Sequence, residues 1–356
     1  MNSAQPIASL HKRISFFCFA LFLIFFTCKP ACAQDTLQIK QDTRYYRAYF
    51  QNLIGRVYSA RKYTTLNLLS HNSLPDFKYR PNTYNGLGVG ITYRALTLNL
   101  GYGFGFLLNS KEKGKTSALD LQTRFYAKRL AVDGYAKTYR GFYLTPKSMG
   151  VKAGTKASDF YTRRDLKIQL FGGSVYRMYN GKGFSLRPAF VQDVKQKKSG
   201  GSFLAGAEWF YINIRSDSSM IPRLIDSAGD RSLTHINMLQ VGPGGGYAYT
   251  RVLPRNFFVT GYLTANLNMS LVREAGFGST NFRAGLNTNL LYRLAVGYDN
   301  GDYNISAYVF NNRINFKGTD YNYRVNTGNV RIMFAKRFKT TRTIRKYMNF
   351  FNILID

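Results

Sequence analysis

Apolar and polar positions alternate along most of the chain that follows residue 33. In Val259–Leu271 the odd-numbered residues are apolar or glycine, and the even-numbered residues are Thr, Tyr, Asn or Ser. The stretches 281–296 and 96–108 follow the same pattern. Successive side chains of a β-strand point to opposite faces, so the alternation predicts strands with one apolar and one polar face.

The length of these runs narrows the fold class. They exceed the ~5–6 residues of an ordinary strand and match the ~9–11 residues that a tilted strand needs to cross a bilayer. Strands can satisfy their backbone groups in hydrocarbon only as a closed barrel. We therefore expect an all-β protein, a transmembrane antiparallel outer-membrane β-barrel over residues 55–338. A soluble β-sandwich or β-propeller would explain the alternation but not the strand length.

The number of strands can be bounded by counting them along the chain. A single-chain bacterial barrel needs an even number, but we mark thirteen. They are 55–68, 84–93, 96–108, 117–129, 131–144, 165–178, 183–194, 201–215, 236–250, 256–272, 281–297, 302–315 and 323–338.

Short turns place the error in this count. Periplasmic turns are short and share one side of a barrel. By our count, three of the five short turns fall on one side and the last two on the other: 93–96, 129–131 and 180–183, against 253–255 and 298–301. One strand between about residues 145 and 235 has therefore been missed or invented, and 145–164 and 217–234 are the suspected stretches. We expect 12 or 14 strands.

The N-terminus has the features of a cleavable signal peptide, residues 1–33. A basic start at 11–13 precedes an apolar run at 14–27, and Ala31-Cys32-Ala33 supplies small residues for cleavage after Ala33. The apolar run is too short to cross ~30 Å of hydrocarbon at ~1.5 Å per residue. This leader predicts export, and with the barrel it predicts the outer membrane of a Gram-negative bacterium.

Two further segments flank the predicted barrel. Residues 34–54 form an N-terminal lead-in, and residues 339–356 form a C-terminal tail. Apolar residues recur in the tail at roughly helical spacing, so we expect there either a short helix or one more strand over residues 345–355. They are Ile344, Tyr347, Phe351 and Leu354.

Composition narrows the chemistry. All three cysteines lie in the leader, so the mature chain has no disulfide, no thiolate metal site and no cysteine nucleophile. The mature chain carries 47 basic and 18 acidic residues, a net charge of +29. Because the basic residues are spread out and the chain is exported, we expect as partners the phosphates of outer-membrane lipid and lipopolysaccharide, or small anionic solutes. Nucleic acid is not expected.

Catalytic signals are weak in this sequence. The mature chain has two histidines, His71 and His235, and neither has a metal-ligand neighbour in sequence. A lipid-modifying barrel enzyme would need a histidine beside a serine and a carboxylate or Asn. We therefore expect no catalytic residue, no metal and no cofactor. The run Gly242–Gly246 resembles a phosphate cradle only in composition and, inside a strand pattern, predicts a bulge or a close backbone approach.

The polar faces of the predicted strands supply the candidate site. Six residues are expected to line the lumen: Asn266, Asn268, Arg283, Asn287, Asn289 and Arg293. A water-filled lumen with this lining would favour anions. The alternative is a lumen that is filled by side chains and an inserted loop and conducts nothing.

Six sequence motifs resemble an uncharacterised bacterial family, domain of unknown function 4421. The motifs are Tyr79-Arg80-Pro81-Asn82, Tyr139-Arg140-Gly141-Phe142-Tyr143, Arg164-Asp165-Leu166, Phe184-Ser185-Leu186-Arg187, Gln196–Ser202 and Gly242–Tyr247. The resemblance covers about residues 50 to 338 and implies an exported, barrel-forming protein. The family brings no activity, so no functional residue is transferred.

Three functions stay open at this point. One is an anion-favouring channel or small-solute transporter. The second is a non-conducting structural or binding outer-membrane protein that acts with an envelope or secretion partner. The third, with the weakest support, is an outer-membrane lipid enzyme. Fold alone does not decide among them.

Overall fold

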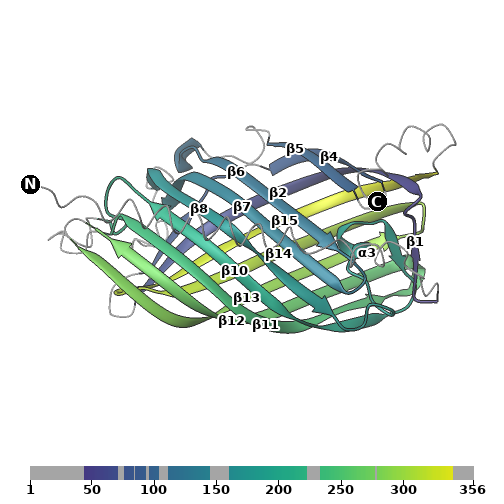
Figure 1. Cartoon of the computed structure of the whole chain (residues 1–356). Coiled ribbons are helices and arrows are strands. Elements are labelled where there is room, and N and C mark those ends of the chain that lie inside the picture. Colours follow the sequence, from purple (N-terminus) through teal and green to yellow (C-terminus); the bar gives the residue numbers. More distant parts are fainter. Residues whose placement is uncertain are drawn as a thin grey trace, which may run out of the picture. The chain divides into compact units, whose positions relative to one another are not determined.

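The described part of the chain is an antiparallel β-barrel (Figure 1). The computed structural model describes residues 44–70, 76–83, 85–93, 96–103, 111–144, 160–222, 233–276 and 279–339. The expected signal peptide, its cleavage after Ala33 and the expected helix or strand in the tail lie outside the described residues. Among the residues described, no helix is long and apolar enough to span a bilayer.

Strands make up nearly all of the regular structure. They are β1 (Tyr46–Ala48), β2 (Asn52–Ser70), β3 (Phe77–Arg80), β4 (Asn85–Tyr93), β5 (Leu96–Gly103), β6 (Ser117–Tyr126), β7 (Leu130–Leu144), β8 (Tyr161–Met178), β9 (Val194–Gln196), β10 (Gly200–Arg215), β11 (His235–Val252), β12 (Phe257–Ala275), β13 (Thr280–Asp299), β14 (Tyr303–Lys317) and β15 (Tyr321–Lys339). The helical turns are η1 (Lys111–Lys113), α3 (Arg187–Phe190) and η4 (Pro254–Asn256).

Ten strands form the closed, hydrogen-bonded ring of the described structure. Their order around it is β2, β15, β14, β13, β12, β11, β10, β8, β7 and β3. The expected total of 12 or 14 is thus not confirmed. The ring closes at ten because Tyr79 and Arg80 of β3 pair directly with Leu144 and Tyr143 of β7.

Three more strands widen the wall beside this closure. Strand β4 pairs with β2 along the part of β2 that β3 does not reach, and β5 pairs with β4. On the other side of the closure β6 pairs with β7. Within the described residues no pairing joins β5 to β6, so these strands lie beside the ring without being links in it.

The two ends of the barrel differ in their connections. The end that holds the start of β2 and the finish of β15 also holds the short connections β4–β5, β6–β7, β11–β12 and β13–β14. We call it the turn end, and the opposite end the loop end. All five short turns that the sequence placed on two sides lie at this one end.

The prediction of a strand at 183–194 was wrong, and this error explains the miscount of strands. This segment forms α3 and continues into β9, both between β8 and β10. Apolar and polar residues alternate in it as in a strand, but Pro188 lies in the first turn of α3 and Gln192 has a φ of 63°. When this strand alone is taken out of the predicted count, all five short turns fall at one end of the barrel. The suspected stretches 145–164 and 217–234 are therefore not needed to explain it.

The two faces of the wall are inverted relative to a soluble protein. On β12 the outward residues Leu263, Leu267 and Met269 are each more than half exposed, at 54%, 55% and 58%. The inward residues of the same strand, including Asn266 and Asn268, are buried. The predicted alternation is confirmed, and it places the polar face inside the barrel and the apolar face outside.

Candidate functional site

An ion pair crosses the lumen. Arg293 on β13 donates through Nη2 to Asp133 Oδ2 on β7 and through Nη1 to the hydroxyl of Tyr126 on β6. Strands β13 and β7 are five steps apart through β12, β11, β10 and β8, about half of the way round the wall, so the pair joins opposite sides of it. Arg293 and Asp133 are each only 2% exposed. A buried pair is stable only with good geometry and further hydrogen bonds, and the Tyr126 hydroxyl contributes one of these.

Aromatic rings surround this pair. The Arg293 guanidinium lies 4.6 Å from the centre of the Tyr262 ring and 5.4 Å from that of Phe310. Tyr135 stacks on Phe310 on one side, with ring centres 5.9 Å apart, and on Phe210 on the other, at 6.1 Å. Cation–π and stacking contacts of this kind fill space as well as stabilise charge. We call Tyr126, Asp133, Tyr135, Tyr262, Arg293 and Phe310 the central seal.

A second polar layer is centred on Glu208 of β10, which is buried. Its carboxylate accepts hydrogen bonds from the side-chain amides of three asparagines, with N–O distances of 2.6 to 3.0 Å: Asn266, Asn268 and Asn289. Tyr176 adds to the layer because its hydroxyl donates to Asn266 Oδ1 at 2.6 Å. Three predicted lumen residues thus share one acceptor, which the sequence reasoning missed. The signal was available, since Glu208 is an acid within the predicted strand 201–215.

Glycines on β11 make room for this layer. A Cβ at Gly244 would lie 1.5 Å from Asn266 Oδ1, and one at Gly242 would lie 2.7 Å from Asn268 Oδ1. The close approach predicted for Gly242–Gly246 is therefore confirmed. Both backbone and side chains of β12 make it, since a Cβ at Gly242 would also lie 2.0 Å from the Leu267 carbonyl oxygen. The alternative of a bulge is wrong, because the pairing of β11 with β12 keeps one register on both sides of the glycines.

A segment between β8 and β10 fills the lumen at the turn end. We call residues 183–199 the plug. Arg187 pairs with Asp193 inside the plug and donates through Nη1 to the Tyr126 carbonyl at 2.7 Å. Arg337 of β15 donates to the Gln192 carbonyl at 2.7 and 3.0 Å. These bonds tie the plug to β6 and β15.

The plug also touches the N-terminal lead-in and the central seal. Strand β9 of the plug pairs with β1. The Phe190 ring lies 6.0 Å from the Tyr126 ring and 5.8 Å from the Arg293 guanidinium. The plug therefore rests directly on the central seal, which it covers from the turn end.

The other predicted lumen residues are placed differently. Asn287 is buried on the inner face and donates to Ser270 Oγ on the neighbouring strand at 2.6 Å. Arg283 is exposed and donates through Nη1 to the Gly318 carbonyl, so it lies at the loop end rather than in the sealed lumen. Four predicted residues, Asn266, Asn268, Asn289 and Arg293, thus belong to the two central layers.

The histidines give no catalytic arrangement in the part that can be described. His71 lies outside the described residues. His235 Nε2 lies 3.1 Å from Asn213 Nδ2 and 3.1 Å from Arg215 Nε, so its neighbours there are nitrogen groups. Within the described ranges, no group of three His, Cys, Asp or Glu side chains could hold a metal ion.

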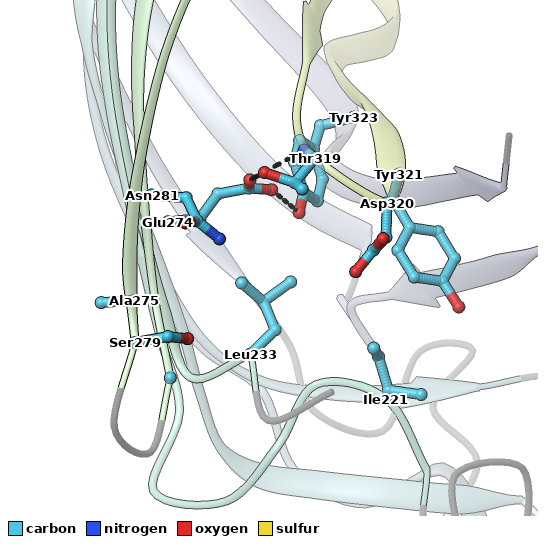
Figure 2. Close-up of a pocket in the computed structure, with 11 residues that line it drawn as sticks. Ile221, Leu233, Glu274, Ala275, Ser279, Asn281, Thr319, Asp320, Tyr321 and Tyr323 are labelled. Carbon is cyan, nitrogen blue, oxygen red and sulfur yellow. Dashed lines mark hydrogen bonds between the residues drawn. The ribbon is translucent and has the colours of Figure 1, made fainter. Parts of the chain in front are cut away.

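A cavity of about 140 Å³ opens at the loop end (Figure 2). Glu274 stands at its centre and accepts hydrogen bonds from the backbone N of Thr319 at 2.8 Å, from its hydroxyl at 2.6 Å and from the Tyr323 hydroxyl. Ile221 and Leu233 supply apolar lining. Both carboxylate oxygens of Glu274 are therefore engaged, and the residue holds the β14–β15 connection against β12.

Comparison with known families gives a single assignment. The model described as "Domain of unknown function (DUF4421)" matches residues 40–338. The chain belongs to this family. A comparison with the curated proteins finds no match.

Two of the motifs of this DUF4421 protein meet where β3 reaches β7. The backbone N of Asn82 donates to Thr116 Oγ1 at 2.8 Å, and Thr116 Oγ1 donates to the Gly141 carbonyl at 2.7 Å. Gly141 has a φ of +90°, and a Cβ there would lie 2.3 Å from the Lys115 carbonyl oxygen. Two other motifs, Phe184–Arg187 and Gln196–Ser202, contain the two ends of the plug. These four motifs thus build the ring closure and the plug.

Solved barrels show a distant likeness to the DUF4421 chain. OmpT of Vibrio cholerae, described as outer-membrane expressed, shares 11% identity at a TM-score of 0.27, covering 79% of this chain and 98% of that one. The translocator domain of the autotransporter NalP from Neisseria meningitidis shares 9% at 0.33, covering 90% and 98%. The toluene transporter TodX of P. putida shares 9% at 0.27, covering 82% and 91%. At these values we draw no functional argument from them.

Proposed function

We propose that this protein is an outer-membrane β-barrel with a closed lumen, and that it acts as a structural or binding protein of the envelope rather than as a channel. The cross-lumen pair of Arg293 and Asp133 carries the proposal. It joins opposite sides of the ring, is almost fully buried and is packed among aromatic rings. A conducting path would need water at this level. The side chains there expose only a few per cent of their surface to solvent.

The outer face supports a location in the membrane. Apolar residues stand out from most of the described wall; the most exposed include Leu100 at 76%, Phe282 at 76% and Phe203 at 70%. Soluble proteins rarely expose continuous apolar surface beyond a few hundred Å². A bilayer would cover this face, and the polar side chains would be satisfied within the barrel. We assign the turn end to the periplasm, because short turns and both ends of the barrel segment lie there.

The wall at the turn end is part of the same proposal. There β4, β5 and β6 stand between β2 and β7, next to the nine remaining ring strands that reach this end. A bilayer would not tolerate two unpaired strand edges in contact with lipid. We therefore propose that the wall has twelve strands at the turn end and narrows to ten where β3 reaches β7.

Four cations of the described lumen are engaged in ion pairs inside the barrel. Asp133 neutralises Arg293 directly, and Arg124 Nε lies 3.7 Å from the second oxygen of Asp133. Lys137 pairs with Asp120 at 3.2 Å. Lys62 Nζ also lies 3.8 Å from Asp120, so each of these two acids is shared by two cations. The four cations are thus held by contacts inside the barrel rather than presented singly to a solute. We assign no catalytic residue and no cofactor to the barrel.

Single-channel recording in planar bilayers tests the closed lumen. We expect no conductance steps from the wild-type protein, and none after the plug is replaced by a short Gly-Ser turn, since the central seal is built from wall strands. Removing the plug together with Arg293→Ala, Asp133→Ala and Tyr135→Ala should produce steps. An open bacterial porin in the same bilayer is the positive control. Stable conductance from wild-type protein would refute the proposal.

A further inference from the structure

The turn end holds a second and larger cavity, of about 350 Å³, which the sealing of the lumen does not use. It lies between the plug and the β11–β12 connection. We call it the turn-end cavity. Its lining combines apolar side chains with three cations: Pro188, Lys195, Gln196, Lys197, Val252, Leu253, Arg255, Asn256, Phe257, Phe258 and Asp299.

Two cations of this cavity, Lys195 and Arg255, make no ion pair with an acid among the described residues. Lys195 Nζ donates to Asn256 Oδ1 at 3.0 Å, a neutral partner. With the part of the chain that the structure describes, the Arg255 side chain makes no hydrogen bond or ion pair that would neutralise it. The Lys195 contact leaves the amide nitrogen of Asn256 as a further donor. The positive charges of Lys195 and Arg255 and the amide of Asn256 around one cavity form a surface that favours an anion with several oxygens.

The single carboxylate in the lining does not cancel this charge. Asp299 accepts from Arg337 at both oxygens, with N–O distances of 2.7 Å each, and Asn304 Nδ2 donates to it at 3.2 Å. Its charge is therefore balanced by a residue outside the cavity lining. The net charge that the cavity presents to a ligand stays positive.

The cavity borders the outer face of the wall. Phe257, one of its lining residues, is 49% exposed and packs edge-on against Tyr298 with ring centres 5.2 Å apart. A molecule in the cavity could thus place an anionic group among the cations and an apolar part toward the outer face. An Arg fork and compact Lys charges are the usual protein ligands of phosphate oxygens.

We propose that the turn-end cavity binds a phosphate group through Lys195, Arg255 and Asn256. The phosphate has two possible sources, the headgroup of an anionic phospholipid in the adjacent leaflet and a soluble phosphate. The lipid source rests on the proposed membrane location, whereas binding of soluble phosphate does not. The cavity contacts Pro188 and β9, so the bound phosphate would lie against the plug.

The test uses the full mature protein refolded in dodecyl maltoside, an uncharged detergent. Isothermal titration measures binding of inorganic phosphate, with acetate at matched ionic strength as the comparison anion. Native mass spectrometry measures retention of phosphatidylglycerol. The test variant is Lys195→Gln with Arg255→Gln. The control is Arg129→Gln with Lys182→Gln, which removes the same charges from exposed residues of the same end outside the cavity.

We expect the test variant to weaken phosphate or phosphatidylglycerol binding by about tenfold or more, and the control to stay within about twofold. Binding of inorganic phosphate alone supports the proposal with a soluble source, and cavity-dependent binding of the lipid alone supports it with a lipid source. Equal losses in test and control variants, equal affinity for acetate, or no binding of either probe overturns it. Heat-modifiable gel migration confirms that each variant is folded, and the conductance of the wild type separately tests the closed lumen.

Discussion

The lumen is closed twice, by the central seal and by the plug, and the two are built differently. In the central seal the paired residues Arg293 and Asp133 are 160 positions apart, and each belongs to a wall strand. The plug is one continuous segment, residues 183–199, held mainly by Arg187 within it and by Arg337 from the wall. The first closure is therefore part of the barrel itself, and the second is an insertion into it.

This difference separates two consequences of mutation. The central seal cannot open unless side chains leave the interior of the ring, so damage there should lower the stability of the whole barrel. The plug can in principle leave its place while the strands stay paired, so damage there should appear first as local opening. Two described contacts join the plug to the central seal: the Phe190 ring on Tyr126 and Arg293, and the hydrogen bond from Arg187 to the Tyr126 carbonyl.

The largest expected effect comes from removing the acid of the central seal. Asp133→Ala leaves Arg293 buried without its counter-charge, and we expect the free energy of unfolding to fall by about 3–5 kcal/mol. Urea unfolding in detergent measures it. Asp133→Ala with Arg293→Met should recover part of the loss, because the buried charge of Arg293 is then removed, while Arg124 keeps its hydrogen bond to Gln122. Asp302→Ala, at an exposed turn-end acid, is the control. A single variant as stable as the double variant would contradict the role of the ion pair.

The second-largest loss of stability is expected from disrupting the contact between the plug and the central seal. Phe190→Ala removes a buried ring that packs on Tyr126 and Tyr308, and we expect a loss of about 3 kcal/mol in the same measurement. If the global unfolding curve is unchanged and only the plug becomes protease-sensitive, the two closures are independent and the coupling inferred here is wrong.

A smaller effect is expected from the ion pair inside the plug. Arg187→Ala leaves Asp193 and the Tyr126 carbonyl without their donor, at a cost of about 1–3 kcal/mol. We expect this cost to appear as local opening of the plug. Trypsin should then cut the plug at Lys195 or Lys197 about tenfold faster while the strands stay intact. Lys182→Ala, on an exposed side chain near the start of the plug, should leave the rate unchanged. Loss of the whole barrel at the same rate as the plug would argue against a separable insertion.

The smallest effect tests a polar contact that does not cross the lumen. Asn287→Ala removes one hydrogen bond, to Ser270 on the adjacent strand, and should cost about 1 kcal/mol. Comparison with Asp133→Ala in the same urea series then separates contacts between neighbouring strands from contacts between opposite walls. A cost for Asn287→Ala that matches Asp133→Ala would remove the distinction.

Local patterns could be recognised from the sequence because they depend on a single strand. The alternation in 259–271 placed Asn266 and Asn268 on the inner face, and the short turns at 253–255 and 298–301 were found at their correct positions. The glycines at 242–246 were linked to a close approach because a missing side chain has few other uses inside a strand. Family membership also followed from motifs that can be read without a structure.

Other features depended on partners distant in sequence. Residues 183–194 alternate like a strand, yet they fold inside the barrel because Pro188 and the surrounding buried contacts favour a turn of helix there. The ring of ten strands arises where β3 meets β7, and a four-residue strand carries almost no pattern of its own. Glu208 was passed over because an acid inside a predicted strand signals a special position, but not that three amides from two other strands converge on it.

The sequence by itself determined a strand-rich wall with an apolar outer face and a polar inner face, because side-chain direction in a strand depends only on position along it. Whether the inner face surrounds water or closes on itself was left open, since Arg293 could equally have lined a pore. Only the tertiary structure decided that Arg293 meets Asp133 across the barrel. The physical reason is that the radius of the ring and the register of its strands set which opposite side chains can touch, and neither quantity is encoded in any single strand.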